Sequence, residues 1–453
     1  MVYFNHTYHL FFQYYPNGTT WGPMHWGHAI SKDLVHWKEL PVALYPDSLG
    51  YIFSGSAVVD SNNTSGFGKG GKIPLVAIFT HHDPIGEKAG KNDFQNESIA
   101  YSLDEGNTWT KYAGNPVLKN PGIRDFRDPK VMWYAKEKKW VMTLATLDHI
   151  TFYSSPNLKD WKKESEFGKG LGAHGGVWEC PDLFPLKLNG KTYWVLIVNL
   201  NPGGPNEGSA TQYFVGEFDG NKFTPIDNNL RWLDYGPDEY AGITWSNTGN
   251  RKIFLGWMSN WLYANQVPTE KWRNAMTIPR ELALKQVSGK ILLTSDPVKE
   301  LTGIENSPFA ISNSRLTGKG IEGIPGQFIL KFNIDRMNDY SVMLSNDSGE
   351  ELVIGYNNAK KQYFIERAKS GKIDFNAEFA KTAFAPRLTN ITSSNIKLVI
   401  DASSVELFAD NGLTVMTSVF FPAKSFTRMK IQNNKGATIK NLKILPLKSI
   451  WQK

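Results

Sequence analysis

The chain has 453 residues, which is long enough for two domains that each bury a core of their own. Hydrophobic residues at 41% and charged residues at 21% are typical of a folded globular protein. The net charge of +7 comes without a basic run, which argues against nucleic acid or membrane lipid as a partner, and no apolar stretch reaches the roughly 18 residues that a membrane span requires.

The first two thirds of the chain repeat one pattern of a short apolar strand, a polar turn and an aromatic residue. The strands have apolar side chains on both faces and are predicted at residues 8–15, 140–146, 192–198 and 252–258. The turns are predicted at residues 31–37, 102–109 and 155–161, with a looser copy at 217–223. The turns recur at intervals of roughly 50 to 70 residues, which predicts the four-stranded blades of a β-propeller.

The pattern changes at a proline-containing joint, residues 294–301. Beyond it, apolar and polar residues alternate in short segments that include residues 327–332, 362–367, 396–400 and 405–408. Alternation with short turns over about 150 residues favours an antiparallel sandwich. The sequence therefore predicts an all-β chain, with a propeller over residues 1–297 and a β-sandwich over residues 305–453.

Two short motifs in the propeller region carry carboxylates. One contains Arg127-Asp128, and the other contains Trp178-Glu179-Cys180. Apolar neighbours raise the pKa of a Glu, whereas an adjacent Arg lowers the pKa of an Asp and keeps it charged. One protonated and one charged carboxyl is the pair that cleaves a glycosidic bond. Local chemistry alone also allows a structural explanation, in which the Glu is half-buried at a strand end and the Arg and Asp form a structural pair.

Other motifs are expected to have structural roles only. Glycine patterns at residues 66–71 and 170–175 open no helix in a βαβ unit, so no nucleotide site is expected. Histidines at residues 25–28 and 81–83 lack further clustered ligands, and the single cysteine excludes a Cys-rich metal site and an internal disulfide. Ser54 lacks the preceding glycine of a nucleophile elbow and fits a polar pocket residue better.

Taken in order, these motifs resemble glycoside hydrolase family 32, which contains invertases, levanases, inulinases and fructan exohydrolases. The matching segments are residues 8–16 and 26–37 for the first blade, 53–56, 126–129 and 178–180 for the catalytic signatures, 272–282 for the propeller end, and 405–412 with 420–422 for the sandwich. The resemblance implies a five-bladed propeller with a funnel-shaped pocket, followed by a β-sandwich, and an enzyme without metal or cofactor.

The resemblance also implies roles for individual residues. Glu179 would be the general acid/base, and Asp128, with Arg127 beside it, would hold fructose hydroxyls and stabilise the transition state. The residues implied to line the fructose pocket are Gln13, Trp21, Phe53, Ser54 and either Trp257 or Trp261, of which we favour Trp261. Cys180 would tune the environment of the acid.

One departure from the family concerns the nucleophile. The family nucleophile is the Asp of a Trp-Met-Asn-Asp-Pro-Asn-Gly motif just before the first-blade strand, whereas residues 16–18 share letters with it but follow that strand. No residue of the sequence is therefore assigned as nucleophile, and weak or absent hydrolysis is expected, since retaining chemistry needs that carboxylate. We expect an upstream segment to carry it; loss of the nucleophile is the alternative.

The function predicted from the resemblance is retaining release of fructose from levan, inulin or sucrose. The main alternative is a non-catalytic fructan-binding propeller; an interaction propeller without a sugar pocket, and a glycosidase acting on arabinan or xylan, fit the motifs less well. The family implies secretion or a periplasmic location, although residues 1–5 show neither the basic nor the apolar region of a signal peptide.

Overall fold

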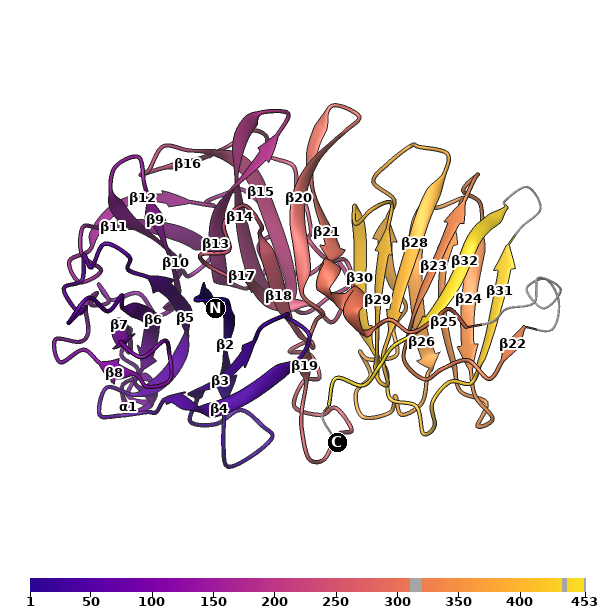
Figure 1. Cartoon of the computed structure of the whole chain (residues 1–453), viewed down its shortest axis with the longest axis horizontal. Helices are drawn as coiled ribbons and strands as arrows, with labels where there is room; N and C mark the ends of the chain where they lie inside the picture. The colour runs from indigo at the N-terminus through magenta and orange to yellow at the C-terminus, as the bar shows by residue number, and fades with distance from the viewer. Residues whose placement is uncertain (310–319, 434–437, 452–453) are drawn as a thin grey trace. The chain divides into compact units, whose positions relative to one another are not determined.

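The computed structural model describes residues 1–309, 320–433 and 438–451, and these residues form an almost entirely β structure (Figure 1). The helical elements among them are α1 (Pro84–Lys88) and the single 3-10 segment η1 (Lys299–Ile304). Contacts divide the chain into two compact units. The first unit comprises Met1–Gly203, Gln212–Arg231 and Ala241–Phe254, and the second comprises Gly204–Thr211, Trp232–Tyr240 and Leu255–Lys453.

Four four-stranded sheets follow one another along the chain, and in each the strands are hydrogen-bonded in sequence order. Their strands are β1 (Val2–Phe4), β2 (Thr7–Tyr14), β3 (His25–Ser31) and β4 (Trp37–Leu44); β5 (Tyr51–Val59), β6 (Leu75–His82), β7 (Gln95–Ser102) and β8 (Thr110–Lys111); β9 (Phe126–Tyr134), β10 (Lys139–Thr146), β11 (His149–Ser155) and β12 (Lys162–Phe167); and β13 (Val177–Leu188), β14 (Lys191–Asn201), β15 (Ala210–Phe218) and β16 (Phe223–Pro225).

A further sheet has the order β17-β18-β20-β21, and β19 pairs with β18. Its strands are β17 (Tyr240–Thr244), β18 (Ile253–Met258), β19 (Ala275–Met276), β20 (Arg280–Val287) and β21 (Lys290–Pro297). The division between the two units passes through β18. These sheets are the blades of a five-bladed β-propeller, so the predicted fold class is confirmed.

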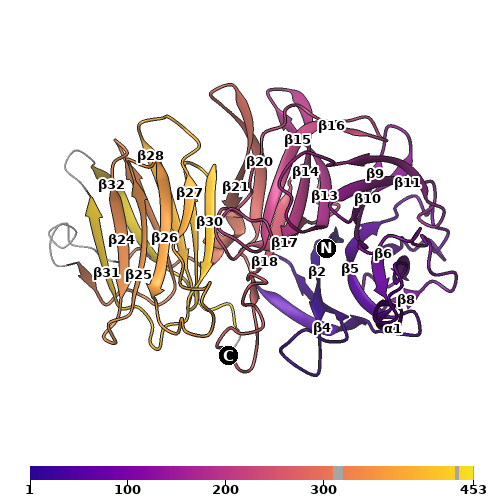
Figure 2. The ribbon, with the colours of Figure 1, turned by 180° about the vertical axis from the view of Figure 1, so that it is seen from behind.

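The start of the chain lies inside the first unit, as the N label between β2, β5 and β13 shows in both ribbon views (Figures 1 and 2). Val2 forms a parallel bridge with Ser246, and the Met1 carbonyl accepts a hydrogen bond from the backbone N–H of Ser246. Met1 is only 5% exposed. β1 therefore pairs with β2 in its own sheet, and its residue Val2 also contacts the segment that contains Ser246.

The repeated turns of the sequence share one hydrogen-bond pattern. In the turn between β3 and β4, Ser31 Oγ donates to Asp33 Oδ1, and this oxygen also accepts from the backbone N–H groups two and three residues further on. The indole N–H of Trp37 donates to the carbonyl of Leu34. The equivalent residues are Ser102, Asp104 and Trp109 between β7 and β8, and Ser155, Asn157 and Trp161 between β11 and β12. The predicted repeat is confirmed at the level of individual bonds.

The turn pattern leads to a stability prediction. Asp33→Ala removes the Oδ1 acceptor of three hydrogen bonds and the Oδ2 partner of His36, and it is expected to lower the free energy of unfolding by about 1–2 kcal/mol. Asp33→Asn is the matched control, because Asn157 fills the same role in another copy, and it should retain most of the stability. Urea denaturation of both variants measures the effect; equal stability of Asp33→Ala and the native chain would contradict the prediction.

The C-terminal part of the second unit contains two antiparallel sheets. One has the order β22 (Ile321–Glu322), β31 (Arg428–Asn433), β24 (Tyr340–Ser345), β25 (Glu351–Asn357), β26 (Gln362–Lys369) and β27 (Ala383–Pro386). The other has the order β30 (Thr414–Val419), β29 (Ser404–Ala409), β28 (Ser394–Ile400), β23 (Phe328–Ile334) and β32 (Ile439–Pro446). Alternate residues such as Val342, Leu344, Leu330 and Phe332 are buried, so the predicted β-sandwich is confirmed.

Two of the sequence signatures meet in a buried ion-pair network of the second unit. Arg280 donates to Asp234 at 2.8 Å and to Glu406 at 2.5 Å, and all three side chains are almost completely buried. A buried charge is tolerated only when it is paired and hydrogen-bonded. The segments at residues 272–282 and 405–412 therefore carry charges that satisfy each other.

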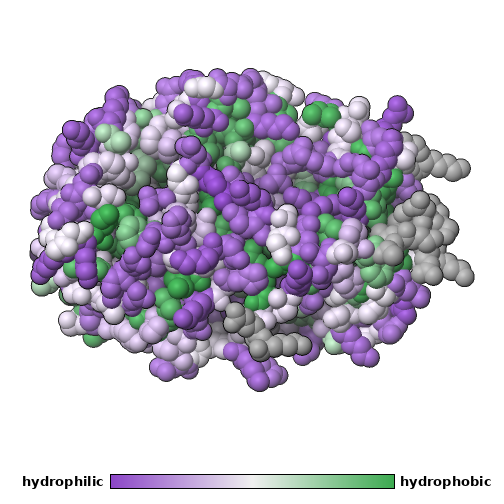
Figure 3. Space-filling model, viewed as in Figure 1, coloured by the Kyte–Doolittle hydropathy of each residue, from purple (hydrophilic) through white to green (hydrophobic). Residues whose placement is uncertain are grey.

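Hydrophilic residues predominate on the face shown in Figure 3, and hydrophobic residues appear there in small, separate patches. None of the described helices is long and apolar enough to cross a membrane.

Candidate active site

Three neighbouring strands of the first unit carry β-bulges at similar positions near their starts. The register shifts between Ile52 and Gly55 on β5, at the segment of β9 that contains Asp128, and between Glu179 and Asp182 on β13. Strands β5, β9 and β13 contact each other in this order. A bulge redirects a side chain out of the ladder and is common next to active sites.

Asp128 lies at the bulge of β9 with a positive φ of 66°, a backbone conformation that costs energy for any residue with a Cβ. Asp128 is 6% exposed, and its carboxyl points to the bulge of β13, where Oδ2 accepts hydrogen bonds from the backbone N–H of Cys180 at 3.0 Å and from its Sγ at 3.6 Å. Cys180 also has a positive φ, of 42°. The two bulges are thus joined through the Asp128 carboxylate.

Arg127 connects the two predicted catalytic motifs. Its Nε and Nη2 donate to Oε1 of Glu179 at 3.2 and 2.9 Å, and its Nη1 donates to Asp125 Oδ1 at 2.5 Å. The surrounding carboxylates, with Glu179 the largest contributor among them, raise the pKa of Arg127, although burial alone would lower it. The prediction of apolar surroundings for Glu179 is wrong: its carboxylate is paired with a guanidinium.

The predicted electrostatics of Asp128 are also wrong. Burial raises the pKa of Asp128 to about 6, while the charge of Arg127 lowers it and the charge of Glu179 raises it again. Adjacency in sequence suggested an Arg–Asp pair, but the hydrogen bonds of the guanidinium go to Asp125 and Glu179. Desolvation of Asp128 therefore outweighs the attraction to its neighbour.

The predicted pocket residues of the first unit differ in their exposure to solvent. Phe53 stacks on His82 with ring centroids 4.2 Å apart, and Trp21, which is 49% exposed, meets Phe53 edge-on at 6.1 Å. Ser54 is half-buried in the bulge of β5, and Gln13 is exposed near the end of β2. The aromatic groups form a surface of the kind on which sugar rings pack.

Trp261 belongs to the second unit. Its ring is 39% exposed and lies 5.1 Å from that of Trp257, so the two candidates for one role are direct neighbours.

Several residues around the site were not predicted from the sequence. Gln95 Oε1 accepts from the backbone N–H of Phe126 and from Arg127, and Thr80 Oγ1 accepts from the backbone N–H of Asp128. Glu97 accepts from Thr80 and is completely buried. These residues lie on the interior strands β6 and β7. Thr80 in the mostly apolar β6 was the available signal, whereas the mixed sequence of β7 did not mark Gln95 or Glu97.

The histidines that were weighed as metal ligands are packed in the sheets. His28 stacks on Phe11 with ring centroids 4.5 Å apart and lies 3.1 Å from His9, measured between ring nitrogens, and His81 Nδ1 lies 2.7 Å from Ser98 Oγ. Within the described part of the chain, no group of three or more His, Cys, Asp or Glu side chains is arranged to hold a metal ion.

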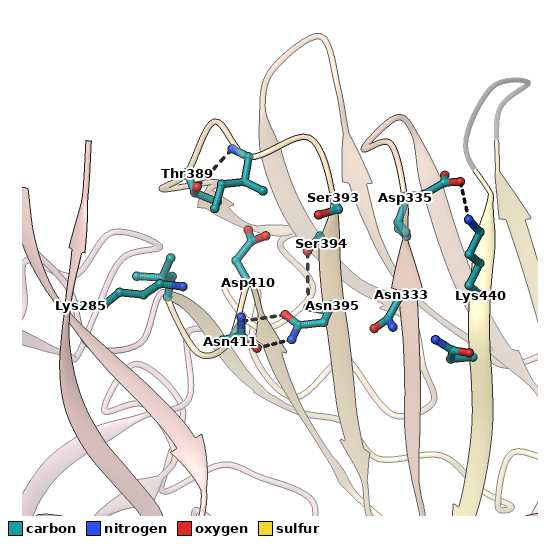
Figure 4. A pocket seen from close by; sticks show the side chains of 14 residues that line it. Lys285, Asn333, Asp335, Thr389, Ser393, Ser394, Asn395, Asp410, Asn411 and Lys440 are labelled. Atoms are coloured by element: carbon teal, nitrogen blue, oxygen red, sulfur yellow. Dashed lines mark hydrogen bonds and ion pairs between the residues drawn. The ribbon is translucent and has the colours of Figure 1, made fainter. Parts of the chain in front are cut away.

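A separate cleft of about 440 Å³ lies on the second unit (Figure 4). Its lining includes Lys285, Asn333, Asp335, Thr389, Ser393, Ser394, Asn395, Asp410, Asn411 and Lys440. The carboxylate of Asp410 is paired with Arg387, that of Asp335 with Lys440, and the amides of Asn395 and Asn411 bond to each other. These groups satisfy one another, so the cluster of the first unit is the better candidate for acid–base chemistry.

Comparison with known proteins places this geometry in a family. Residues 1–296 match the family described as the glycosyl hydrolases family 32 N-terminal domain, and residues 305–446 match the one described as the glycosyl hydrolases family 32 C terminal. A levanase of Bacillus subtilis is 45% identical over 469 residues, covering 100% of this chain and 68% of its own length. An extracellular exo-inulinase of Aspergillus niger is 42% identical over 479 residues, covering 97% and 89%.

Solved structures of an exo-inulinase and a β-fructofuranosidase are similar to this chain over nearly its whole length. The crystal structure of exo-inulinase from Aspergillus awamori superposes with a TM-score of 0.91 at 39% identity, covering 99% of this chain and 95% of that one. A β-fructofuranosidase from Schwanniomyces occidentalis, complexed with fructosyl-erythritol, gives a TM-score of 0.87 at 32% identity, covering 98% and 92%.

Proposed function

The chain belongs to glycosyl hydrolase family 32, and on that premise we propose that it acts on β-fructofuranosides, releasing fructose from levan, inulin or sucrose with retention at the anomeric carbon. The observation that carries the proposal is the hydrogen-bonded cluster in which Arg127 and the bulge at Cys180 bring Glu179 and Asp128 together. The levanase and exo-inulinase relatives support this class of substrate.

In this proposal Glu179 is the general acid/base. It protonates the glycosidic oxygen as the bond to fructose breaks and later removes a proton from the water that releases the sugar. Its exposed fraction of 22% leaves the carboxyl open to a substrate, while Arg127 fixes one of its oxygens.

Asp128 is proposed to hold hydroxyl groups of the terminal fructose and to stabilise the positive charge of the transition state. A carboxylate in a desolvated site interacts more strongly with such charge than one in water. The residues of the first unit that are proposed to line the sugar site are Gln13, Trp21, Phe53, Ser54, Arg127 and Cys180. Trp261 remains a prediction from the resemblance.

Retention requires a second carboxylate about 5 Å from the acid, which forms the fructosyl-enzyme intermediate. The resemblance assigns this nucleophile to a motif that has no counterpart in the printed sequence. Hydrolysis is therefore tested in a chain that carries this motif, and binding is tested in the printed chain.

The alternative is a fructan-binding propeller without catalysis, and a glycosidase of arabinan or xylan is a further one. Isothermal titration with levan, inulin, arabinan and xylan separates these classes of substrate. We expect binding to levan or inulin and none to arabinan or xylan; preferential binding to arabinan or xylan would contradict the proposal.

Secretion is proposed for the location. The support is that an inulinase relative is described as extracellular, together with the size of fructan polymers, which enzymes meet outside the cell.

A further inference from the structure

The bulge that presents Asp128 needs support from outside its own strand. A non-glycine residue at φ 66° is strained, and such strain persists only where surrounding contacts over-determine the conformation. From the β5 side, Ser56 Oγ donates to the carbonyl of Pro129 and accepts from the backbone N–H of Val131. These contacts hold the residues after Asp128 but leave its own backbone N–H to another partner.

That partner is Thr80 on β6. The backbone N–H of Asp128 donates to Thr80 Oγ1 at 3.0 Å, 48 residues away in sequence. A hydroxyl oxygen can accept this bond only with a lone pair turned towards it, so the hydroxyl proton has to point elsewhere. Thr80 is completely buried, where an unpaired hydroxyl proton or an unpaired N–H would each be costly.

Glu97 on β7 accepts the hydrogen bond that the Thr80 hydroxyl donates. Thr80 Oγ1 donates to Glu97 Oε2 at 2.8 Å, and Glu97 lies directly opposite Thr80 in the β6–β7 ladder. Its other carboxyl oxygen, Oε1, has no hydrogen-bond partner among the described residues. Burial raises the pKa of Glu97 well above its usual value, while the hydrogen bond from Thr80 lowers it.

We propose that Glu97 and Thr80 are positioning residues for Asp128. Glu97 orients the Thr80 hydroxyl, the hydroxyl holds the backbone N–H of Asp128, and this relay fixes the bulge in which the Asp128 carboxylate meets Cys180. The relay uses the Oε2 oxygen of Glu97 as a hydrogen-bond acceptor, and this role needs no charge on the carboxyl. The inference rests on the proposed function only in that Asp128 is taken to contact fructose.

The test compares the native chain with variants that break or keep the relay. Thr80→Val and Glu97→Leu remove a hydrogen-bonding group at similar size and are expected to weaken fructose binding about five- to tenfold, as the loss of one buried hydrogen bond would. Thr80→Ser and Glu97→Gln keep the hydroxyl and a neutral acceptor, and both should bind fructose within about twofold of the native chain.

Ser98→Ala is the matched control. It removes a buried hydrogen bond to His81 on the same strand pair but has no bond to the relay, so it should change thermal stability without changing fructose affinity. Affinities are measured by calorimetry well below each melting temperature, so that a purely structural role would not alter them. Native affinity in both Thr80→Val and Glu97→Leu, or an equal loss in Glu97→Gln and Glu97→Leu, would overturn the proposal.

A second readout does not depend on the sugar. The carboxyl ¹³C signal of Asp128, assigned through Asp128→Asn, is titrated with pH in each variant. Thr80→Val and Glu97→Leu should move its midpoint upward, because the Cys180 N–H bond that lowers the pKa of Asp128 is weakened, whereas Glu97→Gln should not. If the native chain fails to bind fructose, the proposed function fails, and unchanged midpoints in all variants would separately refute the relay.

Discussion

Replacement of Glu179 by glutamine is expected to lower kcat for fructose release by about a hundred- to ten-thousandfold, measured in a chain that carries the upstream nucleophile motif. The amide cannot pass a proton to the leaving oxygen, but its carbonyl oxygen still accepts the bonds that Arg127 donates to Oε1. Fructose affinity should therefore remain within about twofold of the native value, since acid catalysis acts in the transition state.

The chemistry of the leaving group supplies the control for this variant. A fructoside whose leaving group departs without protonation should lose far less kcat in Glu179→Gln than sucrose does, because only the second step then needs the carboxyl. Glu164→Gln, a change to a carboxyl on β12 that is bonded to Ser154, should behave as the native chain. Full activity of Glu179→Gln towards sucrose would remove Glu179 from the acid/base role.

Replacement of Asp128 by asparagine is expected to have opposite effects on activity and on stability. Loss of the charge that faces the transition state should lower kcat/KM by about a hundred- to a thousandfold. Burial raises the pKa of Asp128 to about 6, so ionising it at neutral pH costs folding free energy. Above pH 6, Asp128→Asn should unfold with a free energy on the order of 3 kcal/mol higher than the native chain.

The pH dependence of this stability difference has a definite sign. In the unfolded chain the Asp128 carboxyl ionises near pH 3.8, the usual value for an aspartate, whereas in the folded chain it keeps its proton up to about pH 6. Its contribution to stability is thus fully present below pH 3.8 and is lost as the pH rises through 6. Denaturant unfolding of both chains at pH 4 and pH 7 measures it; a variant less stable at pH 7 would contradict the assignment.

The fold was accessible from the sequence because its signals are local and repeated. The turn around Asp33 recurs around Asp104 and Asn157 with a side-chain Oδ1 as the acceptor. The backbone donor lies two residues further on at Asp33 and Asn157 and four residues further on at Asp104. Continuous apolar strands before the joint at residues 294–301 and alternating strands after it distinguish blades from sandwich. The division into blades and sandwich could therefore be predicted from local sequence patterns.

The site was accessible only in part. The motifs predicted Arg127, Asp128 and Glu179 as candidates, but the electrostatics of these residues depend on which partner the guanidinium meets. At a bulge, neighbours in sequence diverge, and Arg127 reaches across to a residue 52 positions away. Glu97 gave no signal because one carboxyl in a strand cannot be read as buried or exposed until the sheet around it is known.

The measurement that tests the account most directly is fructose release from sucrose, levan and inulin by the printed chain and by a chain extended upstream with the nucleophile motif. Rapid release by the chain that carries the motif, abolished by Glu179→Gln, is the result that the account predicts. Binding of fructan by both chains without any release would contradict it and would make the protein a fructan-binding propeller.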